Sequence, residues 1–449
     1  DILKNGTESD GNRKVWTISM WIKRSKLGVR QSLWSWGSNS SSTGEMYIDA
    51  NDFLVLNNDN QQGSTNEVAG QLLDVSAWYH IVWRCDVTET NNIDRWRCYI
   101  NGVQRTLTDA ATISNADGEI NKNGTHQNWI GGAARSLQSG NPIYPFGGYI
   151  AEAIFVDGTA LAPTSFGEFS DDGIWKPIEI DLTFGDEGVY LNFENAAELG
   201  TDVSGNGNTY AETGLTAANQ SIDTCTNNFN TLNPLTKRPA ANGTIAEGNL
   251  QYTASTGDSS IFGTMAIPPG MKVYFEVKLV SNTAQNSIGI HSLYDGGDGA
   301  FVKGGSETGT YSFKPRGSGS VTQYFNNGSS TNTSIDNPAN DTILGVAIDN
   351  ANGQIHYHIA GTYINSSDPT DNDPVALVTG FGGASEQYLH FSLDTSGGAT
   401  ETINEFNFGS PSYSESGGNS DANGFGNFNQ SVPSGYLCLC SKNISSTNS

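Results

Sequence analysis

The chain has 449 residues, and its 22 basic and 47 acidic side chains give a formal net charge of −25. Nucleic acids and anionic membrane surfaces bind clustered Lys and Arg, so this charge argues against both kinds of partner. No apolar run approaches the roughly 18 residues of a membrane span, so we expect no membrane insertion. The aromatic share of 10% favours two or three packed domains over disorder.

Alternating apolar residues predict β-strands along the whole chain, whereas helical spacing is nearly absent. In residues 15–23, one face consists of Trp16, Ile18, Met20 and Ile22. In residues 272–279, the corresponding face consists of Val273, Phe275, Val277 and Leu279. Two more alternating runs, 344–348 and 355–359, flank an Asn- and Gly-rich turn and predict a hairpin. The sequence therefore predicts an all-β protein with two β-sandwich, or jelly-roll, domains.

Polar segments rich in Gly, Asn and Ser set the predicted domain boundaries. We expect one sandwich over residues 1–180, an irregular linker over 181–244 and a second sandwich over 245–440. The polar residues 441–449 are predicted to be a mobile tail.

Two of the five cysteines, Cys85 and Cys98, lie on the apolar faces of two neighbouring predicted strands. If residues 88–95 form the hairpin loop, pairing of Trp83 with Ile100 places the two cysteines opposite each other. We favour two buried free thiols, because free Cys is among the most buried residue types. A cross-strand disulfide is the alternative.

Oxygen-bearing side chains alternate in the segment 202–208, at Asp202, Ser204, Asn206 and Asn208. Glycines between them would let the loop curl round a calcium ion, which makes calcium the one candidate cofactor. Only one carboxylate is present, so we favour a network of Asx and Gly turns without metal.

Catalytic signals are weak. A glycosidase needs two carboxylates facing each other across a cleft, and Glu152 stands alone in its predicted strand. His356 and His358 share the polar face of a strand, and we favour a solvated face over a metal site. The strand-to-helix nucleophile motif G-x-S-x-G is missing, so we predict that the chain is not an enzyme.

Two domain families are recognisable in these patterns. Residues 12–180 resemble the concanavalin A-like, laminin-G-type jelly roll in the segments WTISMWI (16–22), WYHIV (78–82), YING (99–102) and FGGYIAEAIF (146–155). Residues 245–440 resemble a SPRY domain, another β-sandwich, in YFEV (274–277), IGI (288–290), GVAID (345–349), NFG (407–409) and GYL (435–437).

One ordered series of motifs covers almost the whole chain and resembles a family of tail-fibre or lectin-like virion proteins of marine bacteriophages and prophages. The series includes GGYIAE (147–152), VDGTALAP (156–163), FGEF (166–169), WKP (175–177), LNF (191–193) and TNNF (226–229). The resemblance implies a virion protein made in the host bacterial cytoplasm and displayed on the particle surface. Its expected partners are other virion proteins, further copies of itself and host-surface polysaccharide.

Sugar binding needs an aromatic platform beside polar groups that can bind hydroxyls. Loop aromatics in such surroundings are Tyr144 and Phe146, Tyr294 beside Asp295, and Tyr324. Each of these aromatic side chains can instead pack in the core or contact another subunit. We therefore expect a non-enzymatic adhesin for host-surface glycan, with a capsid decoration or head-fibre protein as the main alternative and a polysaccharide-cleaving enzyme as the third.

Overall fold

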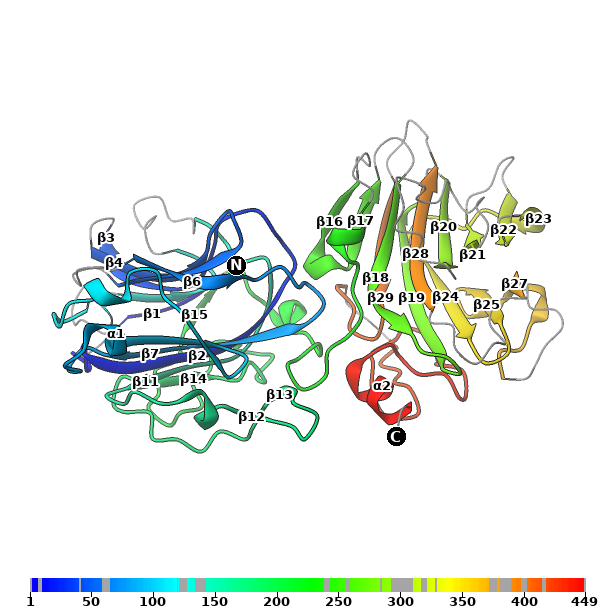
Figure 1. Cartoon of the computed structure of the whole chain (residues 1–449). Helices are drawn as coiled ribbons and strands as arrows, with labels where there is room; N and C mark the ends of the chain where they lie inside the picture. The colour runs from blue at the N-terminus through cyan, green and yellow to red at the C-terminus, as the bar shows by residue number, and fades with distance from the viewer. Residues whose placement is uncertain are drawn as a thin grey trace. The chain divides into compact units, whose positions relative to one another are not determined.

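The computed structural model describes residues 2–6, 10–39, 42–58, 65–118, 120, 127–133, 143–237, 243–254, 259–282, 285–291, 310–315, 321–327, 329–370, 378–379, 389–396, 402–413 and 417–447. The chain forms two compact units (Figure 1). The first contains Asp1–Gln220 and Thr224–Thr226, and the second contains Ser221–Asp223 and Asn227–Ser449. Each unit is built from two large antiparallel sheets, so the all-β prediction is confirmed.

Two sheets face each other in the first unit. The seven-stranded sheet has the order β15 (Ala211–Thr213), β1 (Ile2–Gly6), β10 (Gln127–Ile130), β3 (Gln31–Asn39), β4 (Ser42–Ile48), β5 (Phe53–Asn58) and β6 (Thr65–Gln71). The six-stranded sheet has the order β14 (Val189–Leu191), β11 (Gly148–Asp157), β2 (Val15–Arg24), β7 (Trp78–Asp86), β8 (Trp96–Ile100) and β9 (Val103–Arg105). Apolar side chains of the two inner faces form one core.

Strand β2 is buried on both of its faces. Its inner face carries Trp16, Ile18, Met20 and Ile22 in the core, as the alternation predicts. The alternate side chains, Thr17, Ser19, Trp21 and Lys23, are buried as well. Some further layer must therefore cover the outer face of the six-stranded sheet.

That layer is an irregular segment that follows β11. It contains the two-stranded hairpin of β12 (Gly167–Phe169) and β13 (Trp175–Pro177), which lies below β11 and β14 in Figure 1. Phe166 and Phe184 from this segment pack on Val82 and Ile154 of the sheet. Trp175 lies over Gly102, where an added Cβ would come within 2.4 Å of the indole ring. Only glycine leaves room there for the tryptophan.

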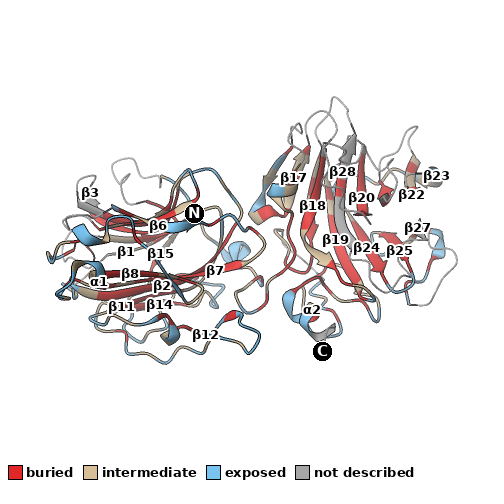
Figure 2. Cartoon of the chain, viewed as in Figure 1, coloured by how far each residue is buried: buried red, intermediate tan, exposed pale blue. Residues whose placement is uncertain are grey.

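The second unit also contains two large sheets. One has the order β16 (Thr244–Ala246), β17 (Gln251–Ala254), β29 (Thr402–Asn407), β19 (Lys272–Ser281), β24 (Thr342–Asp349), β25 (Gln354–Ile359) and β26 (Thr362–Tyr363), with β27 (Val378–Thr379) also paired to β25. The other has the order β18 (Ser259–Ile267), β28 (Leu389–Ser396), β20 (Gln285–His291), β21 (Thr310–Lys314), β22 (Val321–Asn326) and β23 (Ser329–Asp336). Buried residues follow the strands of both units in Figure 2.

The strands predicted for the second unit are confirmed. The predicted face of β19, Val273, Phe275, Val277 and Leu279, lies in the core, and β24 and β25 form the predicted hairpin. Helical structure is limited to α1 (Asn92–Arg95), α2 (Ser441–Thr447) and the 3₁₀ turns η1 (Ala110–Thr112), η3 (Pro163–Ser165), η4 (Ala217–Asn219), η5 (Pro234–Thr236), η6 (Glu247–Asn249) and η8 (Ile364–Ser366) within the described ranges.

The C-terminal segment, residues 417–447, covers the outer face of the eight-stranded sheet. Phe428 and Tyr436 from this segment pack on Tyr274 of β19 and Ala347 of β24. Glu276 of β19 is fully buried and anchors the segment. Its carboxylate accepts hydrogen bonds from the backbone N–H groups of Asn429 (2.9 Å) and Gln430 (2.7 Å), and from the Tyr274 hydroxyl (3.0 Å).

This covering segment corrects two predictions. Of the predicted mobile tail, Ser441–Thr447 form helix α2, and Ser441 donates its backbone N–H to the carbonyl of Asn228 at 2.8 Å. His356 and His358, predicted on a solvated face, are each 1% exposed, because the C-terminal segment and its neighbours close over that face.

The predicted linker also differs from the observed division. Strand β14 pairs with β11 and strand β15 pairs with β1, so residues 181–220 belong to the first unit. Residues 227–244 belong to the second unit, where Asn230 donates its backbone N–H to the Leu439 carbonyl at 3.0 Å.

Replacement of Glu276 by Ala is expected to loosen the second unit. The substitution leaves two backbone N–H groups and a tyrosine hydroxyl without an acceptor, which should cost about 3 kcal/mol or more. Hydrogen–deuterium exchange of β19 and β24 amides in the full chain measures this loss. Asp336, an exposed carboxylate on β23, provides the control Asp336→Ala. Equal protection in the two variants would contradict the anchoring role.

Candidate functional site

The structure separates the predicted sugar-binding aromatics. Tyr144 is 40% exposed in the first unit. Phe146 is half-buried and packs on the core of the first unit, and Tyr324 packs on the core of the second. Tyr294 and Asp295 lie outside the described residues. Tyr144 is therefore the predicted aromatic that the structure places at the surface.

Tyr144 is held in a fixed orientation. Its backbone has a φ of 54°, an unusual value for a bulky residue, and its carbonyl accepts a hydrogen bond from the Ser32 N–H at 2.8 Å. The guanidinium carbon of Arg30 lies 4.6 Å from the centroid of the Tyr144 ring and 3.9 Å from that of Tyr47. Through these cation–π contacts, the Arg30 guanidinium packs over both rings and holds the exposed Tyr144 ring in place.

Polar side chains lie next to this platform on the outer face of the seven-stranded sheet. Arg30 donates to Oε2 of Glu45 at 2.6 Å, and Glu45 is only 3% exposed. Glu45 of β4 is paired with Asn57 of β5, and Ser32 of β3 is paired with Tyr47 of β4, so the side chains of each pair point to the same side. We call these six residues, Arg30, Ser32, Glu45, Tyr47, Asn57 and Tyr144, the Tyr144 patch.

Several buried polar atoms of the Tyr144 patch have no hydrogen-bond partner within the described structure. They are Nε of Arg30, Oγ of Ser32, Oε1 of Glu45 and Oδ1 of Asn57. A buried polar atom without a partner costs about 1–3 kcal/mol, and such atoms are rare in native proteins. Their concentration on three adjacent strands indicates a place where a polar ligand or ordered water completes the hydrogen bonding.

Sequence reasoning found only Tyr144 of this patch. Arg30, Glu45 and Asn57 are far from it along the chain, and the pairing of β3, β4 and β5 brings them together. The alternation of Glu45 and Tyr47 with buried Met46 and Ile48 was the available signal, because it places a carboxylate and an aromatic ring on one face of β4.

The Asp202 loop forms a closed hydrogen-bond network. Oδ1 of Asp202 accepts the backbone N–H groups of Tyr190 (3.0 Å) and Ser204 (2.9 Å), and Oδ2 accepts the Ser204 hydroxyl (2.8 Å) and the Asn208 N–H (2.8 Å). The amide nitrogens of Asn206 and Asn208 both donate to the carbonyl of Gly188 at 2.9 Å. Among the described residues, no group of three His, Cys, Asp or Glu side chains is arranged to hold a metal ion.

Calcium is therefore expected to leave the stability of the first unit unchanged. An ion at Asp202 would have to displace four donors, so about 5 mM CaCl₂, above the roughly 0.1–1 mM Kd of weak calcium modules, should not shift the Tm. Asp202→Ala should lower the Tm by roughly 5 °C, whereas the exposed control Asp171→Ala should not. A rise in Tm with calcium that is lost in Asp202→Ala would contradict this view.

A buried Ser–His pair lies beneath the covering layer of the first unit. Ser19 Oγ is 2.9 Å from Nε2 of His80, and the Trp175 indole N–H donates to Nδ1 of His80 at 2.9 Å. Because Nδ1 accepts this bond, Nε2 of the neutral ring carries the proton and donates to Ser19. A general base must instead accept the serine proton, so the pair cannot activate Ser19 as a nucleophile. Its role is to attach the covering layer to the sheet.

The stability of the first unit should fall in mild acid because of His80. Burial lowers the pKa of His80 to about 3, whereas the ordinary value in an unfolded chain is about 6.5. The stabilisation is complete above pH 6.5 and decreases as pH falls toward 3, by at most about 1.4 kcal/mol per pH unit. Urea unfolding followed by tryptophan fluorescence reports on this unit, because all nine tryptophans lie between residues 16 and 175.

His80→Gln is the matched variant for this measurement. A glutamine amide can accept from Trp175 and donate to Ser19, but it does not titrate. The pH dependence between 6.5 and 4 should become shallower in His80→Gln. An unchanged slope would show that other groups cause it.

The register of β7 and β8 differs from the predicted one. Cys85 is opposite Trp96 and Trp83 is opposite Cys98, so the two cysteines are diagonal neighbours, and both are buried free thiols. Diagonal neighbours are roughly 7–8 Å apart, beyond the roughly 4.4–6.8 Å between Cα atoms that a disulfide spans. The predicted pairing of Trp83 with Ile100 is wrong by two residues.

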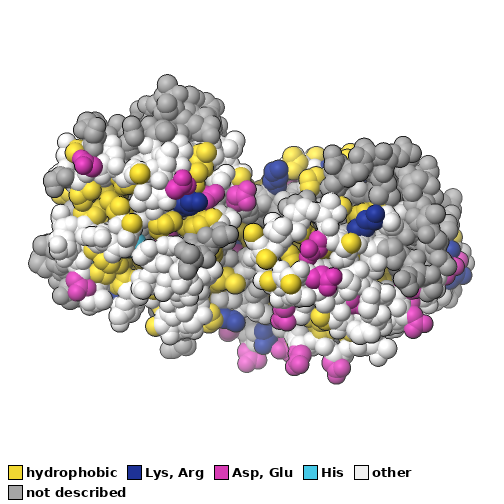
Figure 3. Space-filling model, turned by 180° about the vertical axis from the view of Figure 1, so that it is seen from behind, with side chains coloured by type: hydrophobic (Ala, Val, Ile, Leu, Met, Phe, Trp, Pro, Cys, Tyr) yellow, Lys and Arg dark blue, Asp and Glu magenta, His cyan; other side chains and the backbone are white. Residues whose placement is uncertain are grey.

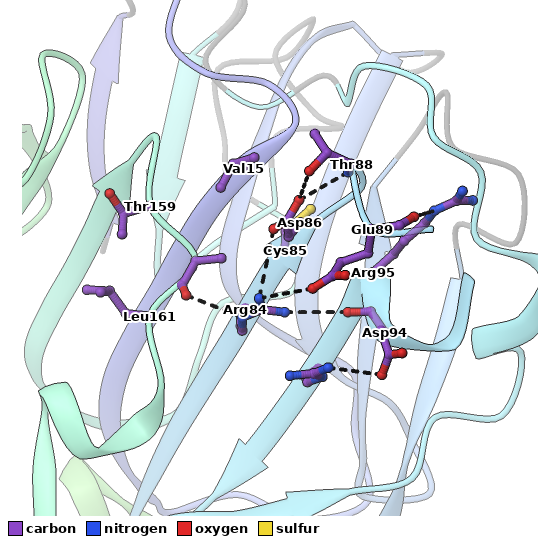
Figure 4. A network of polar contacts seen from close by, with 12 residues as sticks. Val15, Arg84, Cys85, Asp86, Thr88, Glu89, Asp94, Arg95, Thr159 and Leu161 are labelled. Carbon is purple, nitrogen blue, oxygen red and sulfur yellow. Dashed lines mark hydrogen bonds and ion pairs between the residues drawn. The ribbon is translucent and has the colours of Figure 1, made fainter. Parts of the chain in front are cut away.

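Helix α1 is the physical reason for this register (Figure 4). Arg84 donates to the Asp94 carbonyl at 3.4 Å and to the Ala160 carbonyl at 3.3 Å, and its Nη2 is 3.6 Å from Glu89. Arg95 donates to the Glu89 carbonyl at 3.1 Å. The connection is thus an ordered helical turn that ends directly at Trp96, rather than a symmetric hairpin loop.

Glu152 occupies an irregular position in β11. The pairing of β11 with β2 is interrupted between Ala151 and Ile154, and Glu152 has a φ of 50°. Burial raises the pKa of Glu152, and the Tyr190 hydroxyl donates to its carboxylate. Strained, half-buried carboxyls occur at active sites as well as in structural networks. Glu194 is an exposed carboxylate close enough to Glu152 to raise the pKa of Glu152 further.

Residues 5–163 match the family model of the concanavalin A-like lectin/glucanases superfamily, which covers most of the first unit and less than half of the chain. The first unit thus contains a concanavalin A-like, laminin-G-type domain. No curated protein matches the chain, and none of the described helices is long and apolar enough to cross a membrane.

The chain is similar to several solved structures, each at a low level of identity. The SPRY domain of human HERC1 is 11% identical and covers 39% of this chain and 96% of its own, with a TM-score of 0.28. Domains LG4-5 of the mouse laminin alpha1 chain are 8% identical and cover 90% and 84%, with a TM-score of 0.29. A putative carbohydrate binding protein from Bacteroides ovatus is 16% identical and covers 47% and 58%, with a TM-score of 0.31.

Proposed function

We propose that this chain is a non-enzymatic surface protein of a bacteriophage particle, a tail-fibre or appendage adhesin that binds host-surface glycan through the Tyr144 patch. The observation that carries the proposal is the exposed Tyr144 ring, which Arg30 holds beside the partnerless oxygens of Glu45 and Asn57 in the described structure. The lectin-containing superfamily matched by residues 5–163 supports it.

The chemistry of the patch suits a sugar ring. An aromatic face packs against the C–H groups of a pyranose, while carboxylate and amide oxygens accept hydrogen bonds from its hydroxyls. Ser32 can accept or donate, and Nε of Arg30 can donate. A hydroxyl or ordered water that reached the buried acceptors of Glu45 and Asn57 would recover the free energy that these partnerless atoms cost.

The charge of the patch favours neutral glycans over uronic acids and other anionic sugars. The Arg30 guanidinium is already paired with Glu45, so no cation of the patch is left to bind a sugar carboxylate. The net charge of −25 adds long-range repulsion. On the face drawn in Figure 3, acidic side chains lie at several separate places, some of them beside a lysine or arginine.

The virion setting rests on the ordered motifs between residues 147 and 229, which resemble tail-fibre and lectin-like phage proteins. In that setting the chain is made in the bacterial cytoplasm and assembles with other virion proteins and further copies of itself. Weak binding at each patch would be strengthened by the many copies on one particle. The second unit would serve as a SPRY-like β-sandwich spacer or contact domain.

Two alternatives lead to different observations. A capsid decoration or head-fibre protein would recognise no sugar, and an antibody against the chain would label the head evenly instead of the tail. A polysaccharide-cleaving enzyme would use Glu152, whose raised pKa suits a general acid. It would release reducing ends from host polysaccharide, and Glu152→Gln would abolish that release.

Replacement of Tyr144 by Ala should weaken glycan binding about tenfold, which corresponds to roughly 1.4 kcal/mol. The reason is the loss of the stacking surface, while the acceptors of Glu45 and Asn57 stay in place. The measurement is titration of the full chain with soluble oligosaccharides from host surface polysaccharide, because immobilised glycan would mask the effect through avidity.

Phe169→Ala is the matched control for this titration. Phe169 is 52% exposed in the same unit but lies in β12 of the covering layer, away from the patch strands. Equal losses of glycan affinity in Tyr144→Ala and Phe169→Ala, or an unchanged Kd in Tyr144→Ala, would contradict the assignment of the site.

A further inference from the structure

Two of the five cysteines lie close together at the end of the second unit. The Sγ atoms of Cys438 and Cys440 are 3.8 Å apart, and the intervening Leu439 is buried in the core. Cys440 also donates its backbone N–H to the Cys438 carbonyl at 3.1 Å, which is the i to i+2 bond of a γ-turn. The turn brings the two Cβ atoms to the same side. Among the described residues, no other two thiols contact each other.

The surroundings of the pair differ for its two sulfurs. The Cys438 thiol is a donor toward Cys440, and the Asn443 amide approaches the Cys438 sulfur at 3.4 Å. Hydrogen bonds from Cys438, from the Asn443 backbone and from the Asn227 side chain lower the pKa of Cys440. Of the two, Cys440 is therefore the better nucleophile, since the thiolate is the reactive form.

We propose that Cys438 and Cys440 are a dithiol site that closes to an intramolecular disulfide by exchange with a low-molecular-weight disulfide. In the first step the Cys440 thiolate attacks one sulfur of the external disulfide, a mixed disulfide forms and one external thiolate leaves. In the second step Cys438 loses its proton to solvent and attacks Sγ of Cys440, which expels the other external thiolate. Two protein thiols are oxidised and one external disulfide is reduced to two thiols.

Access to the pair depends on helix α2. Both cysteines are fully buried, but Ser441 and Lys442 at the start of the helix are exposed. The start of the helix is attached through the Ser441 N–H to the Asn228 carbonyl at 2.8 Å. Short elements with few buried residues open most readily, so we expect closure to be slow and limited by opening of α2.

Closure would fix the attachment of the C-terminal segment to the second unit. Cys440 forms a β-bridge with Phe229, and the Leu439 carbonyl accepts the Asn230 N–H at 3.0 Å. A disulfide across the turn would limit the opening of these contacts. This inference concerns the second unit and is independent of glycan binding.

The test uses the full chain incubated with oxidised glutathione at pH 8, followed by peptide mass mapping after Asp-N protease, which cleaves before Asp421 and leaves both cysteines in one peptide. The wild type should lose two hydrogens in the peptide that holds both cysteines, without retained glutathione, and dithiothreitol should reverse the change. Cys438→Ser should retain one glutathione at Cys440, because no second thiol expels it. In Cys440→Ser, the remaining thiol of Cys438 should react at least about tenfold more slowly than the wild type.

Cys225→Ser is the matched control and should close the pair like the wild type, because burial raises the pKa of Cys225 to about 12 and no second thiol contacts it in the described structure. Circular dichroism checks that each variant is folded, and the wild-type result does not depend on any variant. Stable glutathione on wild-type Cys440, reaction at Cys225 alone, or no reaction at any cysteine would overturn the proposal.

Discussion

Each unit depends on a covering segment that is fixed to the outer face of a sheet by a buried polar group. In the first unit, His80 accepts the Trp175 indole N–H and so attaches the layer that follows β11. In the second unit, Glu276 accepts the backbone N–H groups of Asn429 and Gln430 and so attaches the C-terminal segment. Without these segments, Trp21 and Tyr274 would expose large apolar surfaces to water.

The covering segments also limit where a ligand can bind. The outer faces of the six-stranded and eight-stranded sheets are occupied by the chain itself, and His80 and His358 on these faces take part in hydrogen-bond chains. His358 accepts the Gly361 N–H at 3.1 Å and contacts the Tyr274 hydroxyl at 2.8 Å. On the seven-stranded sheet, four buried polar atoms of the Tyr144 patch have no partner among the described residues, and they lie beside the exposed Tyr144 ring. That combination points to this sheet.

Local alternation was sufficient to predict the fold but not the site. The buried faces of β2 and β19 follow from period-two patterns, because the apolar residues within each strand alternate and so mark the face that is buried. The predicted register of Cys85 and Cys98 was wrong because helix α1, held by Arg84, replaces a simple loop. The prediction that His356 and His358 are solvated was wrong because the covering segment comes from about 70 residues further along the chain. The Tyr144 patch needed the order of β3, β4 and β5, which no single segment encodes.

Hydrogen–deuterium exchange of the full chain with and without host surface polysaccharide shows whether host glycan contacts the Tyr144 patch. Exchange should become slower on addition of polysaccharide in the peptides that contain residues 30–32, 45–47 and 143–146, with the second unit unaffected. Protection confined to the second unit or to the covering layer, or no protection at saturating polysaccharide, would contradict it.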